Sequence, residues 1–101
     1  MGVTMRIIQR YRITAEREFW ELEAKFAELE RRRPDFPKGR RMKPIAGGEP
    51  MNSLIWECEF PTLEAAHKAL DFFNGDAEHE ALFKLQGPLF EAMRVEFFEN
   101  T

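Results

Sequence analysis

The sequence is poor in cysteine and in long apolar runs, and each shortage excludes a class of protein. Cys58 is the only cysteine among 101 residues, so no internal disulfide can form and a reduced, cytoplasmic setting is expected. No segment approaches the roughly 20 apolar residues of a membrane-spanning helix, and the first residues contain no apolar run of signal-peptide length. We therefore expect a soluble protein that makes no use of a membrane.

Positive charge is also in short supply. The chain has 15 Lys and Arg residues against 18 Asp and Glu residues, a formal net charge of −3. Dedicated nucleic-acid-binding domains are usually basic overall, so nucleic acid is not an expected partner. Phenylalanine, by contrast, is abundant, with ten copies beside two tryptophans. So many rings in a chain of single-domain length must fill a core, a pocket or an interface.

The hydrophobic pattern predicts one α+β domain over residues 1–101. Apolar residues alternate where strands are expected and recur every three or four positions where helices are expected. The predicted strands are residues 3–13, 39–46, 51–60 and 93–98. Three helices are predicted between them: one is capped by Thr14 and ends before Pro34, one is capped by Thr62 and ends at Gly75, and a short one is capped by Asp76 and ends before Gly87. Pro44 within the second predicted strand indicates a position at the edge of the sheet.

This order of elements, with the second helix broken in two, is that of the ferredoxin-like βαββαβ fold. In that fold a four-stranded antiparallel sheet carries the helices on one face. The other face would carry Ile8, Ile55 and Phe98 among arginines and glutamates. Opposite charges on neighbouring strands stabilise a sheet by roughly 0.2–1 kcal/mol per pair, so this face is either solvated or covered by the sheet of a second copy. Its apolar members favour the homodimer.

Two segments of the second half resemble the dimeric α/β-barrel superfamily, above all its NIPSNAP-like and antibiotic-biosynthesis-monooxygenase-like branches. Leu54–Ala66 is a strand with an aromatic residue, Trp56, that leads through a short turn into a helix, and in Phe73–Leu82 a short helix follows Asp76. The first half matches only in the order of its elements. The resemblance implies a homodimer whose two sheets form a barrel. The superfamily includes cofactor-free oxygenases of aromatic polyketides, haem-degrading enzymes and small-molecule isomerases, so the fold leaves the reaction open.

The haem-degrading members of the superfamily use an Asn on the first strand, a Trp on the third and a His on the short helix. Trp56 matches the Trp, Gln9 is the nearest match to the Asn, and the His would fall near Leu82 or Phe83. Neither of these two residues can ligate iron. Haem degradation is therefore not expected, and no cofactor is predicted.

The candidate site is an aromatic pocket between the sheet and the helices. Trp56, Phe19 and Phe72 are candidates for binding a substrate, because rings stack on an aromatic ligand. Tyr11 and His67 are the catalytic candidates, since a phenol can donate to a carbonyl oxygen and an imidazole titrates near neutral pH. Each also has a purely structural interpretation, Tyr11 as part of an aromatic core and His67 as a surface residue.

Two other reactive side chains are not candidates. His79 falls in the first turn of the short helix and is expected to be exposed. No carboxylate or cysteine lies at ligand spacing between it and His67, so no metal site is predicted. Cys58 lies in mid-strand on the side that faces the helices, where a thiol is usually inert.

Seven basic residues gather between the end of the first helix and the second strand, opposed in this stretch only by Asp35. They are Arg31, Arg32, Arg33, Lys38, Arg40, Arg41 and Lys43. Such a run suits an anionic ligand or an acidic partner, although cations also stabilise the C-terminus of a helix.

Taken together, these patterns predict a small-molecule-binding or enzymatic homodimer, in the manner of a cofactor-free monooxygenase or isomerase, with a small aromatic or anionic ligand. The alternative is a non-catalytic homodimer that serves binding or assembly, motivated by the lack of any catalytic constellation in the sequence. Whether the protein is an enzyme stays open at this stage.

Overall fold

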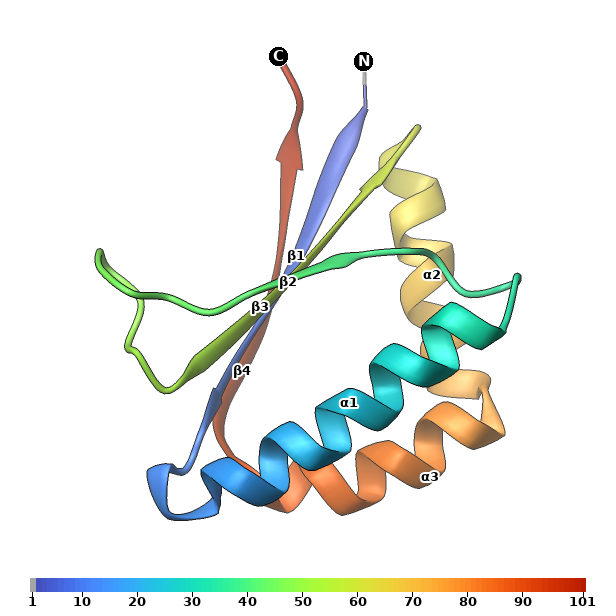
Figure 1. Ribbon diagram of the computed structural model, residues 1–101. Coiled ribbons are helices and arrows are strands. Elements are labelled where there is room, and N and C mark those ends of the chain that lie inside the picture. The colour runs from blue at the N-terminus through green and yellow to red at the C-terminus, as the bar shows by residue number, and fades with distance from the viewer. Residues whose placement is uncertain (1) are drawn as a thin grey trace.

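The computed structural model describes residues 2–101, which form one four-stranded antiparallel sheet in the order β2-β3-β1-β4 and three α-helices. The elements are β1 (Val3–Tyr11), η1 (Ile13–Ala15), α1 (Glu16–Arg32), β2 (Arg40–Met42), β3 (Ser53–Phe60), α2 (Leu63–Gly75), α3 (Ala77–Gln86), η2 (Gly87–Leu89) and β4 (Phe90–Glu99), where η marks a 3-10 turn. The α-helices lie on one face of the sheet, and α3 runs beside α1 (Figure 1). The predicted ferredoxin-like fold is confirmed.

The local sequence explains where the second helix begins and where it breaks. The side chains of Thr62 and Asp76 cap α2 and α3 by accepting hydrogen bonds from the backbone N–H groups of Ala65 at 3.1 Å and of His79 at 3.0 Å. The backbone of Asp76 is extended, with φ −87° and ψ 124°. The chain therefore turns at this residue, and α3 can pack along α1.

The beginning of the chain departs from the prediction at one point. β1 ends at Tyr11, and Ile13 belongs to η1 with 69% of its surface exposed. Thr14 lies in the same 3-10 turn and does not cap α1, because Ala15 takes the N-cap position without a side-chain hydrogen bond. The extra turn moves the N-cap of the helix one residue along the chain, from Thr14 to Ala15.

The remaining strands are shifted at their ends. β2 keeps only Arg40–Met42 of the predicted residues 39–46, and it lies at the sheet edge that Pro44 indicated. β3 begins at Ser53 rather than at residue 51, and β4 begins at Phe90 rather than at residue 93. β4 is longer than predicted because it pairs with β1 over nearly the whole length of both strands, with one register shift near Tyr11.

The side of the sheet that faces the helices carries the core. One cluster contains Met5, Leu29, Phe36, Trp56, Ala66 and Phe73, and a second contains Tyr11, Phe19 and Leu54. Alternate strand residues point to this side, so every second position contributes apolar surface, whose burial stabilises by about 25 cal/mol per Å². Within residues 2–101, none of the helices has the length and apolarity needed to cross a membrane.

The opposite side of the sheet carries charges in register. Glu57 of β3 lies opposite Arg6 of β1 and Arg40 of β2. Its carboxylate accepts hydrogen bonds from Arg6 Nε at 2.8 Å and from Arg40 Nη2 at 2.8 Å, and the residue is only 6% exposed. These guanidinium groups, Arg40 first, hold the pKa of Glu57 below its ordinary value of 4.5.

Glu57 therefore contributes to stability in a pH-dependent way. A carboxyl whose pKa is lowered by folding stabilises the protein above its unfolded pKa, and this contribution is lost as the pH falls through the folded pKa. We expect Glu57→Gln to lower the free energy of unfolding by about 1–3 kcal/mol at pH 7, measured by urea denaturation. The difference from the wild type should shrink progressively below about pH 4.5.

The matched control is Glu59→Gln, which removes the same charge from an exposed position two residues along the same strand. It should change stability little at pH 7. An equal loss in both variants would contradict the role given to the Arg6–Glu57–Arg40 group.

Candidate functional site

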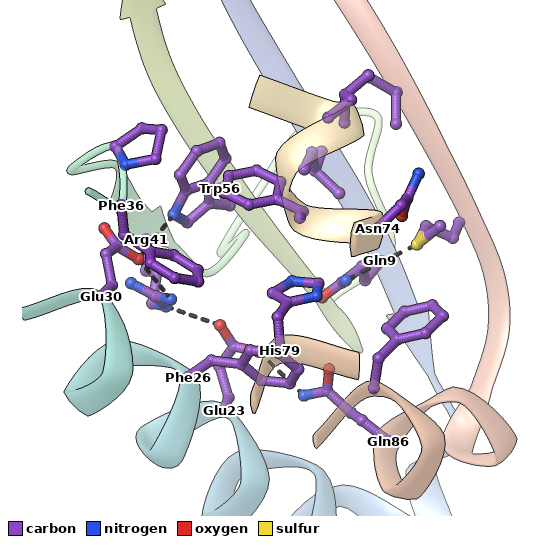
Figure 2. A pocket seen from close by; sticks show the side chains of 17 residues that line it. Gln9, Glu23, Phe26, Glu30, Phe36, Arg41, Trp56, Asn74, His79 and Gln86 are labelled. Atoms are coloured by element: carbon purple, nitrogen blue, oxygen red, sulfur yellow. Dashed lines mark hydrogen bonds and ion pairs between the residues drawn. The ribbon is translucent and has the colours of Figure 1, made fainter. Parts of the chain in front are cut away.

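A pocket of about 130 Å³ lies between the sheet and the three α-helices (Figure 2). Its apolar lining residues are Ile7, Phe26, Phe36, Pro37, Trp56, Leu70, Phe73, Phe83, Met93 and Val95, and its polar ones are Gln9, Glu23, Glu30, Arg41, Asn74, His79 and Gln86. An apolar cavity of roughly 150 Å³ holds one benzene ring. The pocket is thus of a size for a single small ring.

Two neighbours hold the indole of Trp56 in the pocket wall. Its Nε1 donates a hydrogen bond to Glu30 Oε2 at 3.3 Å, and Glu30 Oε1 accepts one from the backbone N–H of Gly39 at 2.7 Å. A Cβ at Gly39 would overlap the indole ring, so only glycine leaves the ring where it is. The ring then meets Phe73 edge-on, with 5.9 Å between the ring centroids.

Arg41 of β2 binds two glutamates of α1 beside the indole. Its Nε donates to Glu23 Oε2 at 2.7 Å, and its Nη2 lies 3.0 Å from Glu30 Oε2. Gln86 of α3, which is 1% exposed, donates to Glu23 Oε1 at 2.9 Å. The two glutamates lie two helical turns apart on one face of α1 and are 6% and 8% exposed. One guanidinium for two carboxylates gives this buried group a formal charge of −1.

The imidazole of His79 is surrounded by phenylalanine rings (Figure 2). It stacks on Phe73 with 5.3 Å between centroids and 13° between planes, and it meets Phe26 edge-on at 5.1 Å. The ring centroids of Phe36 and Phe83 each lie 6.3 Å from that of the imidazole. The imidazole is therefore held by packing from α1, α2, α3 and the loop after α1.

His79 keeps an open hydrogen-bonding position. Within the described residues its Nδ1 is buried without a hydrogen-bond partner, and the Glu80 carboxylate, 3.7 Å away, is beyond hydrogen-bond distance. Burial lowers the pKa of His79 below its ordinary value of 6.5, against the opposing effect of the Glu80, Asp76 and Glu23 carboxylates. The imidazole is therefore neutral near pH 7 and able to accept a proton.

Of the residues proposed from the sequence for the site, Trp56 lines the pocket. Tyr11 and Phe19 lie in the second core cluster instead, where their rings stack at 4.6 Å. The hydroxyl of Tyr11 donates to Glu16 Oε1 at 3.1 Å, and the residue is 1% exposed. This position matches the structural interpretation of Tyr11.

The other proposed residues lie on α2, outside the pocket lining. Phe72 is half-buried and packs against Phe36 at 5.0 Å. His67 is exposed, and its ring lies 4.8 Å from that of Phe97.

Cys58 is half-buried on β3, and its burial raises the pKa of the thiol.

The seven basic residues are engaged within the molecule. Arg31 binds Glu28, Arg32 binds Glu78, Arg33 binds Asp35, Asp76 and Glu78, Lys38 donates to the carbonyls of Glu30 and Arg33, Arg40 binds Glu57, Arg41 binds Glu23 and Glu30, and Lys43 binds Glu16. Each cation of the run thus has a partner in the protein itself.

Sequence reasoning missed Glu23, Glu30, Arg41 and His79 as site residues. The expectation that His79 is exposed is wrong, because its side chain is only 19% exposed. A signal was present in the sequence, since the glutamates interrupt the apolar side of α1 at a spacing of seven residues. Arg41, the cation that the two glutamates share, lies on β2 and comes near them only through the fold.

Comparison with known proteins gives the fold a context. A NIPSNAP family protein from Agrobacterium tumefaciens superimposes with a TM-score of 0.81 at 14% identity, over 99% of this chain and 86% of that one. An uncharacterized NIPSNAP domain protein from Burkholderia xenovorans superimposes with a TM-score of 0.77 at 16% identity, over 100% of this chain and 95% of that one. SnoaB, a cofactor-independent oxygenase from Streptomyces nogalater, superimposes with a TM-score of 0.64 at 17% identity, over 98% of this chain and 92% of that one.

The chain has the fold of the NIPSNAP proteins and of the antibiotic-biosynthesis monooxygenases. This agrees with the resemblance seen in its second half. No family model and no curated protein matches the sequence, and at these identities the similarity describes the fold alone.

The structure changes one argument about cofactors. An imidazole does line the pocket, but it comes from His79 rather than from the positions of Leu82 or Phe83. The positions at which the resemblance places the haem ligand therefore carry no imidazole, and the histidine of the pocket lies three to four residues earlier on α3. The volume of the pocket, about 130 Å³, is close to that of a cavity that holds one small ring. Within residues 2–101 no three His, Cys, Asp or Glu side chains form a group that could hold a metal ion.

The environment of His79 predicts its titration. In a His67→Gln variant, where His79 is the only histidine, NMR titration should give a pKa below the ordinary 6.5. Replacing Phe83 by Ala in the same background admits water to the imidazole and should raise that pKa. A value at or above 6.5 before Phe83 is changed would contradict the burial of the imidazole.

Proposed function

We propose that the protein binds a small ring-bearing molecule in this pocket and that His79 removes a proton from it, in a cofactor-independent oxygenation or isomerisation. The observation that carries the proposal is the imidazole of His79, which lines a pocket walled by aromatic rings and is packed against Phe73. A general base must be unprotonated at the working pH and must face the substrate. The name of SnoaB, a cofactor-independent oxygenase with the same fold, supports the reaction class.

Both reactions begin with the same proton transfer. A C–H bond next to a carbonyl or an aromatic ring loses its proton to the imidazole, and its electron pair stays on the ring-bearing molecule. In an oxygenation this carbanion supplies the electrons that reduce O₂, so that a CH₂ group and O₂ become a C=O group and water. In an isomerisation the imidazolium returns the proton to a different carbon. Neither route needs an additional reductant.

Proton transfer can be measured without the natural substrate. Phenylacetone is a one-ring ketone with an acidic benzylic C–H bond, and its exchange with D₂O is followed by NMR. We expect the protein to accelerate this exchange above the buffer rate and His79→Gln to lose at least 90% of the acceleration, since general bases contribute roughly 10²–10⁴-fold.

The control for this experiment is His67→Gln, which removes the exposed histidine of α2 and should leave the rate unchanged. An exchange rate equal to that of buffer alone would refute the proton transfer. The protein would then match the alternative predicted from the sequence, a non-catalytic homodimer for binding or assembly.

We also propose that the sheet face opposite the helices pairs with that of a second copy. Phe98 on this face is 41% exposed, and the guanidinium of Arg6 lies over its ring at 4.8 Å. The same face carries Glu57 between Arg6 and Arg40, so it offers both charge and apolar surface. A partner that covers exposed apolar side chains on a sheet face removes their surface from water, and this stabilises the dimer.

The oligomeric state tests this pairing. Light scattering after size exclusion should give twice the mass of the 11.9 kDa chain at micromolar concentration. Phe98→Glu places a charge on the covered face and should give the monomer mass. The control Leu63→Glu changes an exposed apolar residue on α2 and should keep the dimer. A wild-type protein of monomer mass would refute the pairing.

A further inference from the structure

The polar wall of the pocket carries more negative than positive charge. Glu23 and Glu30 share the single guanidinium of Arg41, while Gln86 and the indole N–H of Trp56 add only neutral donors. Both carboxylates are less than a tenth exposed, so solvent screens them weakly. The residues that line the pocket therefore carry one formal negative charge in excess.

The same wall has unused acceptors. Each carboxylate oxygen can accept about two hydrogen bonds, and each oxygen of Glu23 accepts one, from Arg41 and from Gln86. The imidazole of His79 lines the same pocket. The aromatic rings of Trp56, Phe73 and Phe83 complete the lining, and their faces attract cations and N–H groups.

We infer that the pocket selects rings that bear a neutral or positively charged hydrogen-bond-donating group, and that it rejects rings that bear an anion. This inference rests on the pocket named in the proposed function and adds the charge class of its ligand. An anionic group would be desolvated next to two carboxylates with only the shared Arg41 to pair with. An alcohol or ammonium group would instead supply the donors that the wall lacks.

Three probes of one ring and different charge test the inference. Benzylamine is protonated at pH 7.5, benzyl alcohol is neutral and benzoate is ionised, and their binding is measured by NMR titration of the wild-type protein. We expect benzylamine and benzyl alcohol each to bind at least tenfold more tightly than benzoate. Val95→Phe, which fills the pocket from β4, should abolish the binding of both and thereby locate it.

Glu23→Gln tests the cause of the selection. The amide keeps the size of the side chain and removes the excess negative charge, so the preference over benzoate should fall at least threefold. Glu28→Gln is the matched control, because it removes the same charge from the exposed side of the same helix and should keep the preference. Glu30→Gln repeats the test at the second carboxylate if Glu23→Gln does not fold.

The outcomes separate the inference from the proposed function. Benzoate binding as tightly as the other two probes would overturn the charge selection and leave the one-ring pocket standing. A preference over benzoate that is unchanged in Glu23→Gln and in Glu30→Gln would also overturn the inference, since the carboxylate charge would then not be its cause. Failure of all three probes to bind would overturn the pocket as a ligand site, and the charge selection with it. Loss of deuterium exchange alone would concern only the role of His79.

Discussion

The guanidinium of Arg41 joins the parts of the molecule from which the pocket is built. It comes from β2, the shortest strand, and it binds two buried carboxylates on α1. Those carboxylates in turn accept hydrogen bonds from Trp56 of β3 and Gln86 of α3. Removing Arg41 would leave two buried carboxylates without their cation, and breaking a buried ion pair typically costs about 3–5 kcal/mol. The strand, the two helices and the indole are therefore held in one arrangement, and the cavity between them keeps its shape.

The same strand is attached on both sides of the sheet. Side chains of neighbouring strand residues point in opposite directions, so Arg40 reaches Glu57 on the open face while Arg41 reaches Glu23 among the helices. A strand that pairs over only three residues gains little from its backbone hydrogen bonds, and these two ion pairs supply further anchorage. Much of the basic run is thus explained by the attachment of an edge strand, and the remainder by the end of α1 and the start of α3.

Several features of the fold follow from local sequence, and others do not. Alternation in β1 and β3 and the caps Thr62 and Asp76 predict the element order, because each depends on neighbours within a few residues. Within the site, Trp56 is predictable as an aromatic residue on the inner face of a strand. Glu23, Arg41 and His79 are not, because their burial depends on contacts between segments that are far apart in the chain. The rings around His79, for example, come from three helices and a loop.

The burial of His79 and the negative charge near it have opposite effects on the pKa of the imidazole. Burial among aromatic rings lowers the pKa of the imidazole, whereas the carboxylates of Glu80, Asp76 and Glu23 raise it. Burial among the rings is the largest of these effects, while Glu23 is tied to Arg41 and Gln86, and Asp76 to Arg33 and the helix cap. The carboxylates would nevertheless stabilise an imidazolium once a proton has been transferred. In the proposed proton transfer, His79 would be a neutral base before the step, and the carboxylates would compensate the positive charge of the imidazolium after it.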